Sequence, residues 1–187
     1  MRSTLLAFVL AALVALAVAP AGAQAAGCTQ SHLPLQDPYC QIGITNSDVS
    51  QDNIDSTICV SGWTSTVRPP TSYTNPLKAQ QIGEYGYSDT NPSDYEEDHL
   101  IPLELGGAPR DPQNLWPEPR YQTGGETASD KDTIENRLKT MVCNGQVSLD
   151  AARLAIACDW VDAISGAQTL DAGGDPCPPY YWDAYYS

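Results

Sequence analysis

The clearest pattern of apolar and polar positions lies between residues 94 and 166, and it predicts two short strands followed by two helices. Residues 94–102 are predicted to form a strand that Pro102 ends, and residues 114–117 a short second strand. The loop between them holds a Gly-Gly pair and two further prolines, which favour tight turns.

The apolar positions that follow recur with helical spacing. A capping-box-like pair, Ser129 and Asp132, predicts the start of a helix that ends at Asn144-Gly145. Its apolar stripe has the spacing i, i+4, i+7, i+8 and consists of Ile134, Leu138, Met141 and Val142. A second helix is predicted from Ser148. Its apolar face consists of Leu149, Ala152, Ile156, Trp160, Val161 and Ile164.

The flanking segments are less regular. Residues 26–52 are predicted to form an irregular arm, and residues 57–60 a short strand because they are rich in β-branched residues. Residues 77–85 are predicted to be a helix that Gly86 ends. From residue 167 the chain is rich in Gly and Pro and then aromatic, which indicates a loosely packed tail.

Residues 1–25 have the pattern of a secretory signal peptide: one arginine, a short apolar run and Ala-x-Ala sites. We therefore expect a secreted, extracellular protein with no stable membrane association after cleavage. Two alternatives are an uncleaved anchor and a lipoprotein modified at Cys28. The apolar run is short for a membrane span, and the residues before Cys28 only loosely match a lipidation box.

All six cysteines lie after the leader, and an even number in an exported chain indicates disulfides. Six cysteines permit 15 pairings. The preferred pairing joins Cys59 to Cys143 within the motif-bearing core, with two local clasps, Cys28–Cys40 and Cys158–Cys177. A zinc site is disfavoured because no pair has C-x2-C spacing and the chain has only two histidines.

The net charge of −14 argues against a surface that binds nucleic acid through many basic side chains. A bound divalent cation would supply positive charge locally, so the acidity does not exclude a phosphodiester substrate. Length and pattern together predict one small disulfide-linked α+β domain, residues 53–166.

Asp98 and His99 stand at the end of the first predicted strand and carry the candidate chemistry. Hydrolysis of a phosphodiester needs a base to activate water and a cation to stabilise charge on the phosphate. Neighbouring strand residues point to opposite faces, so both side chains reach one site only where the strand twists or ends. A residue from the following helix must then complete the site.

The string Tyr95-Glu96-Glu97-Asp98-His99-Leu100-Ile101-Pro102-Leu103-Glu104-Leu105-Gly106-Gly107, followed by Asn114-Leu115-Trp116-Pro117, resembles the core of HNH, or His-Me-finger, endonucleases. More narrowly, the chain is similar to small exported actinobacterial proteins that share Cys59-x-x-Gly62-Trp63, Val67-Arg68-Pro69-Pro70 and Lys131-Asp132-x-x-Glu135-Asn136. The resemblance covers residues 55–165. It implies a ββα-metal motif with His99 as general base, Asp98 as metal ligand and Asn114 as the residue that fixes the loop presenting His99.

The chain departs from that pattern on the helix, because no histidine follows His99 and the zinc-binding cysteine pairs are missing. The remaining ligand must be an oxygen donor, and the candidates are Asp132, Glu135 and Asn136. Oxygen donors favour Mg²⁺, Mn²⁺ or Ca²⁺ over Zn²⁺.

Two functions therefore stay open at this point. One is a metal-dependent endonuclease that acts on DNA or RNA outside the cell. The other is a disulfide-linked binding module that keeps the scaffold without useful catalysis, and the acidity and the missing helix histidine favour it. The intact set of Asp98, His99 and Asn114 favours the endonuclease, which is the function we expect. Two of these residues also have a simpler structural interpretation. Asn114 could cap a turn without any role in catalysis, and Asp132 could stabilise the helix N-terminus without binding a metal ion.

Overall fold

The computed structural model describes residues 27–187 of the protein. Strands β1 (Tyr95–His99) and β2 (Leu115–Pro119) form an antiparallel pair in which His99 lies opposite Leu115. The loop between them contains two short 3-10 turns, Leu103–Leu105 and Pro112–Asn114. Helix α3 (Ala128–Cys143) follows β2, so the chain has the expected order of strand, loop, short strand and helix.

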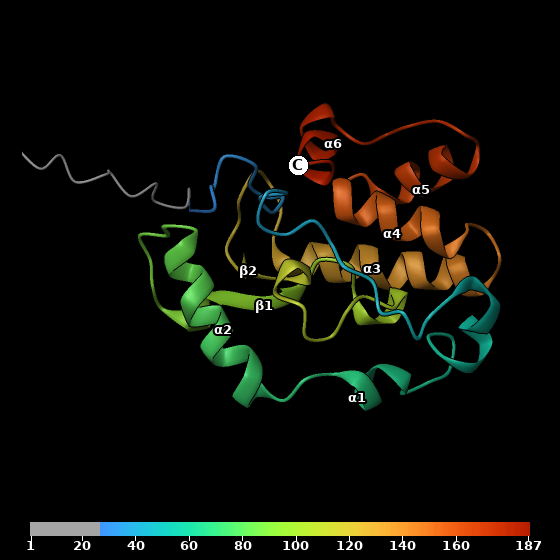
Figure 1. Ribbon diagram of the computed structural model, residues 1–187, viewed down its shortest axis with the longest axis horizontal. Coiled ribbons are helices and arrows are strands. Elements are labelled where there is room, and N and C mark those ends of the chain that lie inside the picture. The colour runs from blue at the N-terminus through green and yellow to red at the C-terminus, as the bar shows by residue number, and fades with distance from the viewer. Residues whose placement is uncertain (1–26) are drawn as a thin grey trace, which may run out of the picture.

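Five further helices surround this unit: α1 (Trp63–Val67), α2 (Thr71–Glu84), α4 (Leu149–Cys158), α5 (Ala163–Asp171) and α6 (Pro179–Tyr185). Helix α2 lies on one side of the strands, and α3, α4 and α5 are stacked on the other (Figure 1). The larger apolar core fills this stack, with Leu138, Leu149 and Trp160 among its buried residues. A smaller cluster that includes Tyr95 and Trp116 lies between α2 and the strands. The α+β class is confirmed.

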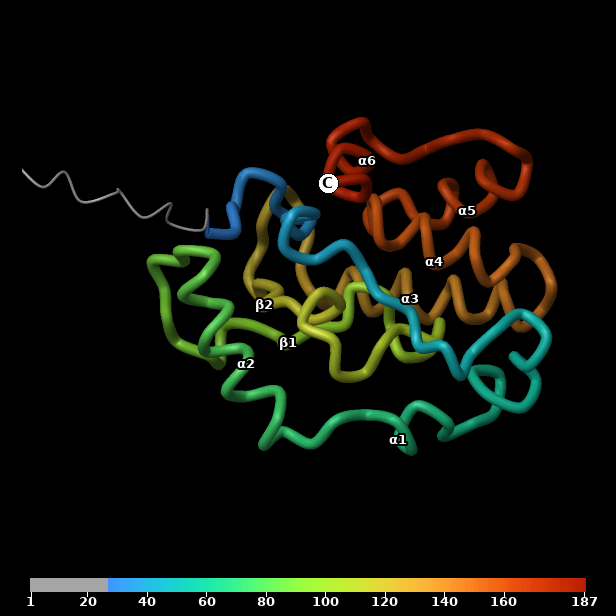
Figure 2. Tube along the Cα trace, viewed as in Figure 1, coloured from blue at the N-terminus to red at the C-terminus, as the bar shows by residue number. Residues whose placement is uncertain are grey.

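The N-terminal arm crosses the molecule beside the loop that joins the strands (Figure 2). The backbone N–H of Gly43 donates to Gln113 O at 3.0 Å, and that of Ala108 donates to Ile44 O at 2.8 Å. A third bond runs from the Asn46 N–H to Gly106 O, at 2.9 Å. The arm is irregular, as expected, and it braces the loop that carries the candidate site.

The three disulfides are those of the preferred pairing, Cys28–Cys40, Cys59–Cys143 and Cys158–Cys177, and that prediction is confirmed. Such a set is typical of an oxidising, extracellular environment. Within residues 27–187, no helix is both long and apolar enough to cross a membrane. The predicted signal peptide lies outside the described residues.

Some predicted elements differ in the structure. Residues 57–60 form turns, so the short strand predicted there is wrong; Cys59 is held instead by its disulfide to α3. Helix α2 begins at Thr71, six residues before the predicted start, and contains Pro76. Helix α3 begins after Thr127, whose backbone N–H donates to the Asp130 carboxylate at 2.9 Å, so the capping pair lies two residues earlier than predicted.

The C-terminal part is more ordered than the pattern predicted. The single helix expected after Ser148 is two helices, because Asp159 is extended (φ −160°, ψ 91°) and ends α4. Helix α5 continues past residue 166. The loose tail is also wrong, because α6 inserts Tyr181 into the main core with 2% of its surface exposed.

Candidate active site

Asn114 closes the loop between the strands through its side chain, which is fully buried. Its Oδ1 accepts a hydrogen bond from Ile101 N at 2.9 Å. Its Nδ2 donates to Ile101 O at 3.0 Å and to Ala108 O at 3.1 Å. The hydrogen bond expected between Asn114 and the 102–113 loop is therefore present, and one carboxamide binds both the start of the loop, at Ile101, and its middle, at Ala108.

Gly107 makes this closure possible. A Cβ at this position would lie 1.7 Å from Ile101 O, which is inside any allowed contact. Only glycine lets the loop backbone approach the end of β1 this closely.

His99 is the last residue of β1, and its ring is held by the loop that Asn114 closes. The ring atom Nε2 lies 3.2 Å from Pro109 O. A carbonyl oxygen can only accept, so Nε2 must carry the proton and the neutral ring has its lone pair on Nδ1. Burial lowers the pKa of His99 below 6.5, an effect that the nearby Asp98 carboxylate opposes. The imidazole is thus neutral at pH 7, and Nδ1 can accept a proton.

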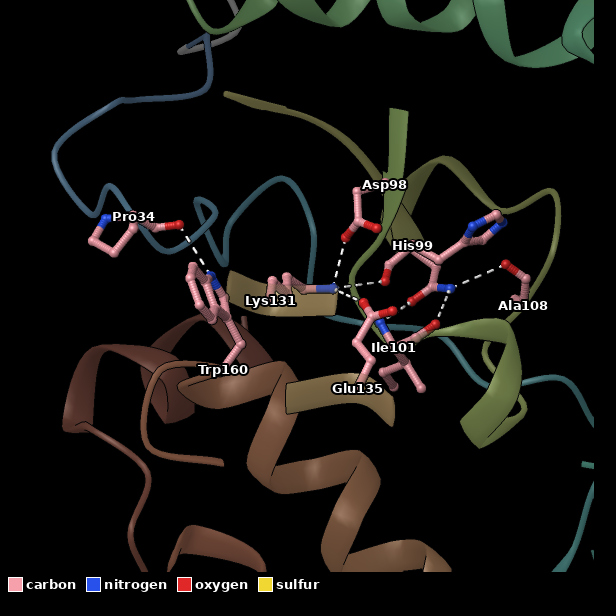
Figure 3. Close-up of polar contacts among 9 residues, drawn as sticks. Pro34, Asp98, His99, Ile101, Ala108, Lys131, Glu135 and Trp160 are labelled. Carbon is pink, nitrogen blue, oxygen red and sulfur yellow. Dashed lines mark hydrogen bonds and ion pairs between the residues drawn. The ribbon is translucent and has the colours of Figure 1, made fainter. Parts of the chain in front are cut away.

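Asp98 is buried on the side of β1 that faces α3, where Lys131 binds it. The Lys131 ammonium donates to Asp98 Oδ2 at 2.6 Å and to the backbone O of His99 at 3.1 Å, and it also contacts Glu135 Oε1 (Figure 3). Lys131 itself is fully buried. The ammonium lies between the two carboxylates that the resemblance makes candidate metal ligands.

The charges around Lys131 explain how an ammonium is kept in the interior. Burial alone lowers the pKa of Lys131, but the carboxylates of Asp98, Glu135 and Glu118 outweigh that effect and raise it. Burial also raises the pKa of Glu118 and of Glu135. Oε1 of Glu118 has no hydrogen-bond partner. Lys131 therefore stays charged, and its charge is shared by more carboxyl groups than it can neutralise.

The other two helix candidates face a different place. Asp132 and Asn136 line a hollow of about 170 Å³ on the exposed side of α3, together with Arg68, Glu104 and Glu135. The Asn136 amide donates to Asp132 O at 2.8 Å. Figure 3 shows the His99 ring turned away from Lys131 and Glu135. The structure brings Asp98 and Glu135 together through Lys131, and it does not bring the His99 ring to them.

The residues present do not fit a preformed site for a divalent cation. Within residues 27–187, no group of three or more His, Cys, Asp or Glu side chains is arranged to hold a metal ion. A cation between Asp98 and Glu135 would also meet the ammonium of Lys131, which already occupies that space.

Lys131 is the functional-site residue that the sequence pattern left without a role. It lies one turn before Glu135 and two turns before Leu138, on the buried face of α3. A lysine on an apolar stripe with a glutamate four residues on is a signal for a buried ion pair, because an uncompensated charge there is costly. The N-terminal arm was also missed as a support of the site.

Comparison with known proteins gives no assignment. No protein-family model matches the chain, and no curated protein or solved structure matches it significantly.

Proposed function

We propose that this protein is a secreted hydrolase of the HNH type that cleaves phosphodiester bonds in DNA or RNA, with His99 as the general base. One observation carries the proposal: the hydrogen bond between His99 Nε2 and Pro109 O, at 3.2 Å. It selects the neutral tautomer with a free Nδ1, which is the form a base needs. Asn114 supports this arrangement by holding Ala108, the residue before Pro109.

In the proposed reaction, Nδ1 of His99 takes a proton from a water molecule. The water oxygen forms a bond to phosphorus while the bond from phosphorus to the leaving sugar oxygen breaks. The leaving oxygen takes a proton from solvent, and His99 returns its proton to solvent. Asn114 acts as a positioning residue, because it touches the loop and not the reacting atoms.

The divalent cation implied by the resemblance, Mg²⁺, Mn²⁺ or Ca²⁺, supplies no step of this scheme. The contacts of Lys131 with Asp98 and Glu135 argue against a preformed cation site. Dependence of the cleavage rate on a divalent cation remains a prediction of the resemblance.

The test is cleavage of supercoiled plasmid and of a labelled RNA oligonucleotide by the purified protein. The variant His99→Ala should lose roughly 10²–10⁴-fold of the rate, the usual contribution of a general base. A matched control is His32→Ala, because His32 lies away from the loop and packs against Tyr180, with ring centroids 4.5 Å apart and ring planes tilted by 33°. We expect His32→Ala to keep the wild-type rate. Equal rates for His99→Ala and wild type would refute the proposal.

The pH profile gives a second test. Because burial lowers the pKa of His99, the rate should rise with pH to a midpoint below 6.5 and then stay level. A rate that still rises above pH 7 would point to a different base.

The alternative is a binding module that has lost catalysis on the same scaffold, and the Lys131 contacts favour it. An ammonium that binds both Asp98 and Glu135 stabilises a fold without a metal ion. Pure wild-type protein that cleaves neither DNA nor RNA with any divalent cation, or with chelator, would establish this alternative over the hydrolase.

A further inference from the structure

The lysines and arginines of this acidic chain differ in their hydrogen-bond and ion-pair partners. Of nine lysines and arginines, Arg2 lies outside the described residues. Lys131 and Arg153 are buried in internal hydrogen bonds, and Lys78 binds backbone oxygens beside β1. Arg120 forms an ion pair with Glu96 at 2.9 Å. In the described part of the chain, the cations whose charged groups have neither an ion pair nor a hydrogen bond are Arg68, Arg110, Arg137 and Lys139.

Arg110 belongs to the loop that holds His99. It follows Pro109, whose carbonyl binds the His99 ring, and its side chain is exposed. The Arg110 guanidinium lies over the Tyr73 ring, 5.7 Å from its centroid, and the Tyr73 hydroxyl donates to Arg110 O at 2.5 Å. These contacts attach the loop to the first turn of α2 and hold the guanidinium over the Tyr73 ring.

Arg68 lies in the turn between α1 and α2, shortly before Tyr73. It is the C-cap of α1, two residues before the N-cap of α2 at Pro70, and it is exposed. Its side chain lines the hollow that also contains Glu104 and Asp132. The hollow also contains Pro102 and Leu103 of the loop that follows His99, so Arg68 lies beside the segment that holds the ring.

We propose that Arg68 and Arg110 hold the phosphate groups that flank the bond presented to His99. This inference rests on the proposed function, and it names the part of the surface that binds the polyanion. A guanidinium offers a planar fork of donors that suits a phosphate. Glu104, Asp111 and Asp132 lie nearby, so the attraction is confined to the two arginines and the rest of the surface repels nucleic acid.

Two phosphate contacts predict a specific salt dependence. Each contact contributes about −0.9 to the slope of log K against log salt on duplex DNA, so two give about −1.8. Between 50 and 200 mM salt the affinity should fall about 12-fold with both arginines, and about 3.5-fold with one.

The experiment measures binding of a labelled DNA duplex, and of a single-stranded RNA in a second arm, by fluorescence anisotropy. The protein is the full chain carrying His99→Ala, in chelator, so that no substrate is consumed. Arg68→Gln and Arg110→Gln are compared with Arg137→Gln, which removes an equal charge from an exposed position of α3. Circular dichroism checks that each variant is folded.

We expect Arg68→Gln and Arg110→Gln each to reduce the salt slope on duplex DNA by about 0.9, and Arg137→Gln to leave it unchanged. Equal effects from all three variants would overturn the proposal, because binding would then follow net charge. If wild-type protein cleaves nucleic acid but Arg68→Gln and Arg110→Gln have the same salt slope as Arg137→Gln, the phosphate contacts are refuted and the hydrolase is not. Binding that needs both arginines, without cleavage by wild-type protein, would refute the hydrolase alone.

Discussion

The variant Asn114→Ala tests whether one carboxamide holds the candidate site together. The substitution removes three hydrogen bonds to backbone groups, those of Ile101 N, Ile101 O and Ala108 O. Asn114 is fully buried, so these groups lose their partners in the interior.

The size of the effect follows from those contacts. Each buried polar group left without a partner costs about 1–3 kcal/mol. Water entering the space of the lost carboxamide recovers part of this, so we expect a loss of about 3–5 kcal/mol in the free energy of unfolding. That is a large share of the about 5–15 kcal/mol of a typical domain. Loosening of the loop also frees Pro109 O, so the cleavage rate should fall even where the variant is folded.

The assay is urea unfolding followed by circular dichroism, with the disulfides intact. Asn75→Ala is the control: Asn75 lies exposed on α2, and alanine favours a helix, so its stability should stay the same or rise slightly. A loss below about 1 kcal/mol for Asn114→Ala would refute the argument that these three bonds close the loop.

Three further predictions concern pH, metal ions and disulfides. Both carboxyl oxygens of Glu97 are buried without hydrogen-bond partners, and burial raises the pKa of Glu97 to about 8, although Lys78 opposes this. The folded protein therefore favours the protonated carboxyl, so the fold should lose stability as the pH rises from 4.5 through 8. Glu97→Gln should therefore stabilise the protein at pH 9 and leave its stability nearly unchanged at pH 4. The gain at pH 9 is at most about 5 kcal/mol, because a change of one unit in a pKa corresponds to about 1.4 kcal/mol. An equal change in the free energy of urea unfolding at both pH values would contradict this. The resemblance predicts that chelator abolishes cleavage and that excess Mn²⁺ partly restores Asp98→Ala, whereas the contacts of Lys131 with Asp98 and Glu135 predict a rate that chelator leaves unchanged. Cleavage lost in chelator would show that a cation binds despite Lys131. Replacing the Cys59–Cys143 pair by serine should lower the free energy of unfolding by about 4.5 kcal/mol, and replacing the Cys28–Cys40 pair by about 3 kcal/mol. The first disulfide costs more to lose because it closes a loop of 84 residues, against 12 for the second. Thermal unfolding that ranks the two variants in reverse would refute the loop-entropy account.

The strand, loop, strand and helix around His99 could be predicted because local signals agree there. Pro102 ends the first strand, glycines allow the turn, and the stripe of α3 has helical spacing. Asn114 was predicted to fix the loop, and its hydrogen bonds to Ile101 and Ala108 are present.

Other features depend on contacts distant in sequence, which local patterns do not contain. The bond from Lys131 to Asp98 spans 33 residues, so the spacing of Lys131 and Glu135 signals a buried ion pair but does not identify Asp98 as the second partner. Tyr181 packs into a core formed by elements distant in sequence, and the Cys158–Cys177 bond links the segment before α6 to the end of α4. The predicted start of α2 is wrong because a proline usually marks the first turn of a helix, whereas Pro76 lies inside α2.

The order of the disulfides has a consequence for biogenesis. Each cysteine is bonded to its nearest unpaired neighbour along the chain: first to second, third to fourth, and fifth to sixth. If the predicted signal peptide exports the chain with its N-terminus leading, an oxidase that joins cysteines in the order in which they emerge would form the native set directly. Maturation of this protein should then require an oxidase and no disulfide isomerase, even though one of its bonds spans 84 residues.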